Sequence, residues 1–164
     1  MKLQKATYFA LYAVLELAAD PARQLSAVEI AEKYGISAHH LAKVLRGLGR
    51  AGIVDSTRGV GGGYRFAGNA KRLTLLDVIR LFEPLGNERS ASGEQHPNNA
   101  AGRALKLVLN EIDEHAAATF RSITISTMLK IMAQRLASEP TKETRRPRAR
   151  PEGRGSGSRT GSTG

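Results

Sequence analysis

Apolar side chains recur every three or four residues over much of the chain, and this spacing predicts several amphipathic helices. The first 20 residues superficially resemble a signal peptide, but Glu16 interrupts their apolar run. We therefore expect a folded first helix, and because no other stretch approaches membrane-spanning length, we expect a cytoplasmic protein with no membrane partner. The apolar face of this first helix is formed by Tyr8, Leu11, Tyr12, Leu15 and Ala19.

Two short helices are predicted next, and each begins at a serine. Ser26 and Glu29 have the spacing of a capping box, in which each side chain bonds a backbone N–H of the first turn. Gly35 stands where helices commonly end in a left-handed residue, and Ser37 opens the following helix. The predicted buried stripe of that helix is Leu41, Val44, Leu45 and Leu48, which leaves His39, His40, Lys43, Arg46 and Arg50 largely on other faces.

A tight glycine turn between two short helices, the second with a basic and hydrogen-bonding surface, is typical of a helix-turn-helix unit. An ordinary helical pair is the alternative. If the unit binds DNA, the outer face of its second helix is the recognition surface.

The segment "RGVGGGYRF", residues 58–66, is suited to a phosphate cradle, a plain hairpin turn or a DNA-binding wing. It lacks the G-x-x-x-x-G-K-[ST] pattern, and no helix is predicted directly after it, so a nucleotide site is disfavoured. Two β-prone runs, residues 53–57 and 64–66, flank the loop and favour a hairpin. Because this hairpin follows the presumed recognition helix, we interpret it as a wing. Its glycines, Gly62 among them, allow close backbone approach to DNA, and Arg58 and Arg65 supply positive charge.

The second half of the chain is predicted to hold two more helices and a third at its C-terminal end. Thr74 and Asp77 have cap spacing and start a helix that ends near Pro84. A polar loop without periodicity follows. From Asn99 onward a long amphipathic helix is expected, which pairs with a second copy or packs only on its own domain. Its apolar stripe is Ala101, Leu105, Val108, Ile112 and Ala116.

The charge distribution divides the chain into parts. The net charge is +10, with an excess of +6 in residues 1–72, none in 73–138 and +4 in 139–164. A basic front segment suggests contact with a polyanion. The C-terminal residues are almost devoid of apolar side chains, so we expect a disordered basic tail, which either adds to DNA binding or is merely solvated.

The run "LGRAGIVDSTRGVGGGYRF", together with "MKLQKATYFALYAVLELA" and "LTLLDVIRLFEPL", resembles the Rrf2 family of bacterial winged-helix transcription regulators, the group that includes IscR, NsrR, RirA and CymR. The likeness extends from Met1 to about Leu136. It implies a mainly α fold with a small β-hairpin wing, composed of a winged helix-turn-helix and a long dimerisation helix. The expected parts are a DNA-binding domain over 1–82, a loop over 83–98, the dimerisation and C-terminal helices over 99–137, and the tail over 138–164.

The resemblance also implies a homodimer on double-stranded DNA. The positions that match the recognition helix of the family are Ser37, His39, His40 and Lys43, and Arg58 matches its wing arginine. We add Arg46, Gly62 and Arg65 to this candidate DNA-binding set from their place on the helix and hairpin. Because the family more often has a serine and an aromatic residue at positions 39 and 40, base preference stays open.

One departure from the family concerns its cofactor. Many relatives hold an iron–sulfur cluster with three cysteines, and the matching positions here fall near Ala91, His96 and Gly102, with Tyr8 at the place of an additional acidic ligand. The chain has no cysteine, and such clusters depend on thiolates. We therefore expect no cofactor and no metal site, although His96 with Glu88 or Glu94 is the one candidate for a weak site.

These observations favour a sequence-specific DNA-binding regulator, most simply a homodimeric repressor on a near-palindromic promoter site. The alternative is a winged-helix module that binds an acidic regulatory protein. An enzyme is disfavoured because the sequence shows no nucleophile–base pair, metal cluster or paired carboxylates. The effector, the operator and the regulated genes do not follow from these residues.

Overall fold

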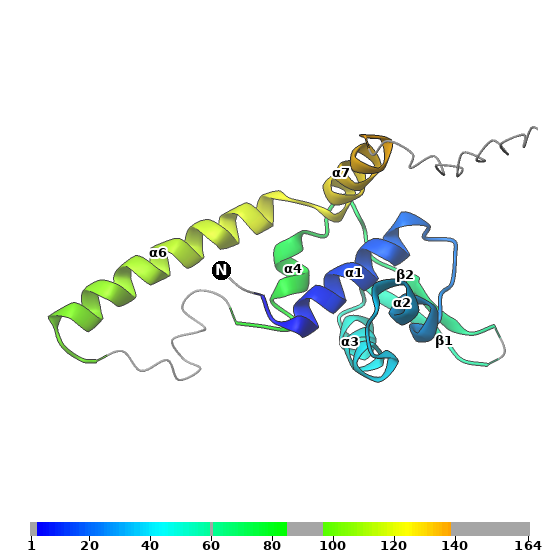
Figure 1. Ribbon diagram of the computed structural model, residues 1–164, viewed down its shortest axis with the longest axis horizontal. Helices are drawn as coiled ribbons and strands as arrows, with labels where there is room; N and C mark the ends of the chain where they lie inside the picture. The colour runs from blue at the N-terminus through cyan, green and yellow to red at the C-terminus, as the bar shows by residue number, and fades with distance from the viewer. Residues whose placement is uncertain (1–2, 60, 85–96, 139–164) are drawn as a thin grey trace, which may run out of the picture.

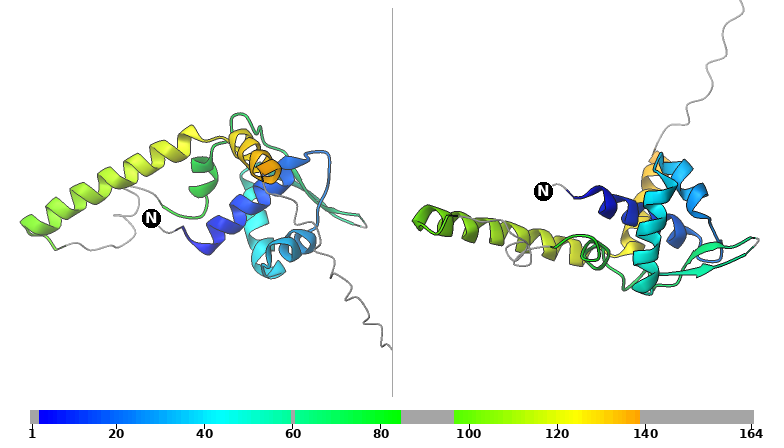
Figure 2. Two further views of the ribbon diagram at one scale, coloured as in Figure 1. Left: turned by 45° about the horizontal axis from the view of Figure 1, so that its top comes forward. Right: turned by 90° about the horizontal axis from the view of Figure 1, so that it is seen from below.

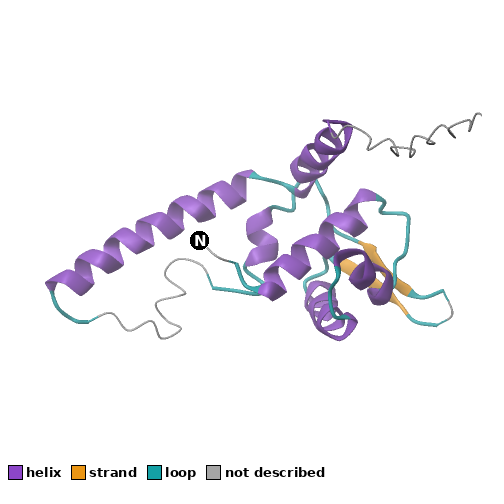
Figure 3. Cartoon of the chain, viewed as in Figure 1, coloured by secondary structure: helices purple, strands orange, loops and turns teal. Residues whose placement is uncertain are grey.

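The computed structural model describes residues 3–59, 61–84 and 97–138, and the regular secondary structure in these ranges is helical except for one two-stranded hairpin (Figures 1 and 3). No helix in the described ranges is long and apolar enough to cross a membrane. The elements are α1 (Lys5–Ala19), α2 (Ala27–Tyr34), α3 (Ala38–Arg50), β1 (Val54–Thr57), β2 (Gly63–Phe66), α4 (Leu75–Ile79), α6 (Ala100–Ser122) and α7 (Ile125–Ser138).

Helix α1 lies at the centre of the hydrophobic core. It contacts α2, α3, α4, α7 and β2, and its inner face includes Ala10, Ala13, Val14 and Leu17, all essentially inaccessible to solvent. The small alanines on this face let the neighbouring helices approach closely. Three of the predicted face residues are instead exposed, Tyr8 at 41%, Tyr12 at 40% and Ala19, so the buried stripe is rotated from the predicted one.

Helices α2 and α3 form the predicted helix-turn-helix. The capping box is present, since the Ser26 hydroxyl accepts from the Glu29 N–H at 3.1 Å and the Glu29 carboxylate accepts from the Ser26 N–H at 2.7 Å. Gly35 ends α2 with φ 62°, a left-handed conformation that favours glycine. Ser37 does precede α3 as predicted, but its side chain makes no capping hydrogen bond.

The hairpin of β1 and β2 is antiparallel, with Val54 opposite Phe66 and Thr57 opposite Gly63. Residue 25 extends this sheet, because Leu25 and Tyr64 exchange two backbone hydrogen bonds of 2.9 and 2.7 Å. Ile53, Val54 and Phe66 are buried at the base of the hairpin, which fixes the wing to the core next to α3. The fold is therefore a winged helix-turn-helix, as predicted.

Helix α4 is shorter than expected. Its capping box of Thr74 and Asp77 is present, but the helix ends at Ile79 and tight turns continue to Glu83, where the sequence predicted helix almost to Pro84. These turns place Phe82 against α3, where a methyl group added at Gly47 would lie 3.3 Å from the Phe82 ring. The helix therefore ends before Phe82 and Glu83, the residues that pack against other parts of the fold.

Helix α6 projects from the core, as both views of Figure 2 show. Asn99 caps it by accepting a hydrogen bond of 2.7 Å from the Gly102 N–H. Only its C-terminal end, at Ala117 and Phe120, packs against the core. Helix α7 then returns to α1 and buries Ile125 completely, and Thr124 pairs with Thr74. The residues predicted to form the polar loop and the basic tail lie mostly outside the described residues, except for 83–84, 97–98 and 138.

Candidate nucleic-acid interface

The outer face of α3 carries the predicted base-reading residues. Because α3 buries Leu41, Val44, Leu45 and Leu48, the helical period turns the intervening side chains outward. The two histidine rings lie edge to face, 6.0 Å apart. The exposed candidates on this face are Ser37, His39, His40, Lys43 and Arg46.

A basic row continues along α3 past the predicted set. Lys43, Arg46 and Arg50 line a shallow hollow of about 380 Å³ on the helix surface. Their spacing of three and four residues places them on adjacent turns of one face. Arg50 was recognised in the sequence as exposed but was not placed in the candidate set, and the row makes it a candidate for a phosphate contact.

The wing presents its two arginines differently. Arg58 is exposed just after β1, at the start of the wing tip. Arg65 lies across from Asp55 in the register, and its guanidinium donates to that carboxylate at 3.2 Å. Because both side chains of this pair are more than half exposed, the attraction between them is screened by solvent. The Asp55 carboxylate therefore partly offsets the positive charge of Arg65 and not that of Arg58.

The glycines of the wing tip are required by the hairpin itself. Gly61 has φ 76°, in the left-handed region. At Gly62 a side chain would collide with the carbonyl of Thr57, and the Gly62 N–H donates to the Gly59 carbonyl at 2.9 Å. The sequence predicted that these glycines let the backbone come close to DNA. In the structure Gly62 lets two backbone segments of the turn come close to each other. Contact between Gly62 and DNA stays a prediction.

An ion pair joins α1 to α2, the first helix of the helix-turn-helix. The Glu16 carboxylate accepts from the Lys33 ammonium at 2.7 Å and from the Tyr34 hydroxyl at 2.8 Å. Partial burial alone would raise the Glu16 pKa, but these two hydrogen bonds and the Lys33 charge bring that pKa below its ordinary value. Burial and the Glu16 hydrogen bond raise the pKa of Tyr34, whose ring also stacks on Tyr12 at 4.9 Å. The pair orients α2 relative to α1.

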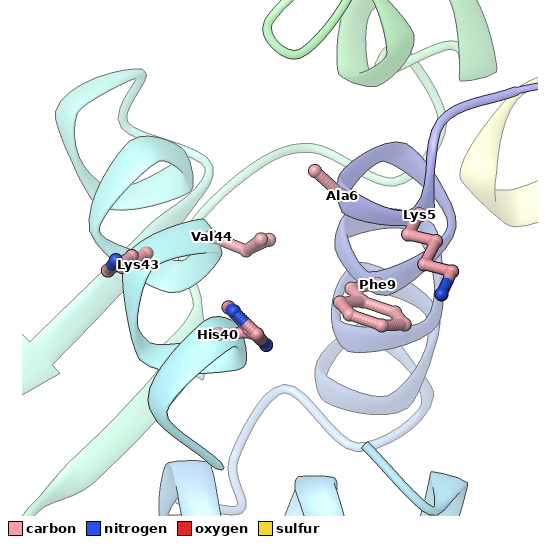
Figure 4. A pocket seen from close by; sticks show the side chains of 6 residues that line it. All are labelled: Lys5, Ala6, Phe9, His40, Lys43 and Val44. Carbon is pink, nitrogen blue, oxygen red and sulfur yellow. The ribbon is translucent and has the colours of Figure 1, made fainter. Parts of the chain in front are cut away.

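The described surface also includes a pocket that the sequence did not suggest. It lies between α1 and α3 and is lined by Lys5, Ala6, Phe9, His40, Lys43 and Val44 (Figure 4). Lys5 and Phe9 were not predicted site residues, because only the packing of α1 against α3 places them beside the recognition helix. No local sequence signal could have identified them.

The predicted dimerisation stripe is largely uncovered in the protomer. Leu105, Val108 and Ile112 are each at least half exposed, whereas Ala116 is half-buried close to the core. Leu107, on the opposite side of α6, is 71% exposed. A continuous row of exposed apolar side chains on a projecting helix is characteristic of an interface.

The residues at the family's cluster positions do not fit an iron–sulfur cluster. A thiolate is absent from the whole chain, and a side chain at Gly102 would collide with the carbonyl of Pro97. Tyr8, at the place of the acidic ligand, is an exposed aromatic residue 6.4 Å from the Tyr12 ring. Ala91 and His96 lie outside the described residues, and within the described ranges no cluster of three or more histidine or acidic side chains could hold a metal ion.

The helix pair, the hairpin after it and the exposed basic helix define a winged helix-turn-helix protein. A family model described as "Rrf2: Iron-dependent Transcriptional regulator" matches residues 3–131. The chain therefore belongs to the Rrf2 family of transcriptional regulators, and it is a regulator of transcription rather than an enzyme. The resemblance stated from the sequence is confirmed.

Individual relatives agree with this assignment. A protein of Rhodopseudomonas palustris named "Putative HTH-type transcriptional regulator BadM" is 56% identical over 133 residues, which cover 80% of this chain and 83% of that protein. The T. potens IscR structure has a TM-score of 0.67 at 24% identity and covers 85% of this chain and 94% of its own. The B. subtilis CymR structure has a TM-score of 0.66 at 24% identity and covers 80% and 98%, respectively. At these identities the two structures support the fold alone.

Proposed function

We propose that this regulator is a homodimer that binds a near-palindromic promoter site and represses transcription by occupying it. The observation that carries the proposal is the outer face of α3, where two exposed histidines and Lys43 lie opposite the buried apolar stripe. Such a helix fits the major groove of DNA, and its side chains can donate hydrogen bonds to base edges.

In this proposal the other parts act on the DNA backbone and on the partner subunit. Arg58 in the wing contacts phosphates, and Arg46 and Arg50 follow the groove edge. The stripe from Ala101 to Ala116 on α6 pairs two protomers, so that two copies of α3 meet successive major grooves. Dimeric readers of this kind require half-sites about one helical turn apart, which makes the operator near-palindromic.

The same proposal assigns no cluster to the protein. Without a thiolate, and with Gly102 packed against Pro97, the chain lacks the ligands for a cluster of the family type. Binding to the operator is then independent of iron. Any signal must act through another ligand or partner.

DNase protection over the promoter upstream of the protein's own gene and its neighbours tests the proposal. The expected result is a protected near-palindrome, with two protomers per site in light scattering of the complex. Binding to all DNA with equal affinity, or stable capture of an acidic protein with no DNA preference, would support the protein-interaction alternative instead.

A further inference from the structure

The pocket between α1 and α3 combines apolar walls with basic groups. Figure 4 shows Ala6 projecting from α1 and His40 and Val44 projecting from α3 toward the space between the helices, with the Phe9 ring on the face of α1. Lys5 and Lys43 lie on the outer sides of the two helices, and both are exposed. The pocket has a volume of about 370 Å³, which is at the small end of the range of ligand sites.

These features specify the chemistry of an occupant. Phe9, Ala6 and Val44 offer an apolar surface that favours an apolar body. Two lysines around it favour a negative charge, the His40 ring can form a hydrogen bond, and no acidic residue lines the pocket. The flexible four-carbon stems of the lysines allow their ammonium groups to reach over the mouth.

We propose that this pocket binds a small organic monoanion, a carboxylate on a short alkyl chain or single ring, and that this ligand competes with DNA. The competition with DNA rests on the proposed function, in which His40 and Lys43 contact the operator. Since one side chain cannot serve both partners, binding of either ligand excludes the other. The ligand is therefore an inducer.

DNA backbone is the competing occupant, and the lining disfavours it. A phosphodiester is hydrated and needs polar contacts, as Arg46 and Arg50 provide. The aromatic face of Phe9 and the branched Val44 side chain provide none. The apolar wall is thus better matched to a hydrocarbon group than to a sugar-phosphate chain.

Binding is tested first on the DNA-free protein with hexanoate and its neutral isostere hexanamide. In ¹H–¹⁵N correlation spectra at constant ionic strength, hexanoate should shift the amides of residues 5–9 and 40–44 saturably, with a Kd on the order of 1 mM for so small a ligand. Hexanamide should bind more weakly by about threefold, because only the charge differs.

Two variants locate the site, and a third serves as control. Ala6→Leu keeps every basic residue but places a larger side chain in the pocket, so hexanoate binding should be lost while operator binding is retained. Lys5→Gln should lower hexanoate affinity about threefold and reduce the preference for hexanoate over hexanamide. Lys130→Gln removes an exposed lysine of α7 far from the pocket in sequence and should change neither. Circular dichroism melting checks that Ala6→Leu folds.

Operator titrations with a labelled duplex complete the test. Hexanoate at several times its Kd should release DNA from the unaltered protein but not from Ala6→Leu, with sodium chloride at equal ionic strength as reference. Operator binding without saturable amide shifts would overturn the ligand site and leave the proposed function intact. Hexanoate binding without operator binding would support the ligand site and overturn the proposed function. If Ala6→Leu weakens operator binding as much as Lys43→Gln, the pocket belongs to the DNA interface and the proposal fails.

Discussion

Arg58 and Arg65 stand on the same hairpin but differ in their surroundings. Arg65 is paired with Asp55 at 3.2 Å, whereas Arg58 is exposed at the wing tip. A charged side chain that reaches only phosphate contributes equally to every DNA sequence.

Arg58→Ala should therefore weaken binding to operator and to unrelated DNA alike and lower the salt slope by about one unit. Lys43→Ala or His40→Ala should instead cost about 1 to 3 kcal/mol on the operator and change the base preference. Fluorescence anisotropy on operator, single-substituted operators and random duplex separates the two effects, with Lys130→Ala as control. Normal binding by Arg58→Ala would contradict the assignment of the wing.

Glu16 gives a pH-dependent contribution to stability. Its folded-state pKa lies below the ordinary value of 4.5, so its bonds to Lys33 and Tyr34 stabilise the fold above that pH and are lost as the pH falls through the folded pKa. Glu16→Gln should cost about 1 kcal/mol at pH 7, and this difference should vanish in acid. Thermal melts from pH 7 to 3 measure it, with exposed Glu32→Gln as the matched control. A difference independent of pH would show that the ion pair does not contribute.

At the scale of elements, α6 carries an apolar stripe that its own protomer leaves largely uncovered. Leu105 and Leu107 are both at least half exposed, but they lie two residues apart and so face opposite sides of the helix. Leu105→Glu should shift the protein from dimer to monomer and lower operator affinity, because a carboxylate cannot be buried in an apolar interface without a large penalty.

Leu107→Glu is the same substitution on the other side and should leave the dimer intact. Sedimentation at several concentrations and thermal melts measure assembly and folding separately. Both variants should fold, since neither leucine is part of the core. A dimer that survives Leu105→Glu but not Leu107→Glu would place the interface on the opposite face.

The helices show which features a sequence can predict. The capping boxes at Ser26–Glu29 and Thr74–Asp77 were predictable because both partners lie within one turn of chain. The early end of α4 and the exposure of Tyr8 were not, because each depends on neighbours distant in sequence. The exposed face of α3 was predictable because it follows from the helical period of α3 alone. The pocket that Lys5 and Phe9 form with α3 was not, because it depends on how α1 packs against α3.

At the scale of the whole molecule, the basic C-terminal residues can be tested by removal. The last described helix ends at Ser138, one residue beyond the predicted boundary. Truncation after Ser138 should leave the melting temperature and the dimer unchanged, because the remaining sequence has almost no apolar side chain to bury. The only expected loss is in nonspecific DNA binding at low salt. A marked fall in melting temperature would show that these residues pack on the fold.

The absence of cysteine leads to a second test on the intact protein. Anaerobically purified protein should be colourless and bind its operator with unchanged affinity after exposure to nitric oxide. Absorbance spectra, iron analysis and operator titrations before and after nitric oxide measure this directly. Stoichiometric iron with visible bands, or release of DNA by nitric oxide, would overturn the assignment.

The short segment after α4 restricts how this sequence can diverge. Glu83 is buried and accepts from the Thr7 hydroxyl at 2.6 Å and from the Gln4 N–H at 3.2 Å, and the ring of Phe82 covers Gly47 of the recognition helix. A side chain at position 47 requires the Phe82 ring to shift. Loss of the hydroxyl at position 7 leaves a buried carboxylate with fewer donors. We therefore expect the effects of substitutions within each of these two pairs to be coupled rather than additive. Sequence change in the DNA-reading helix is therefore coupled at Gly47 to Phe82, a residue 35 positions further along the chain.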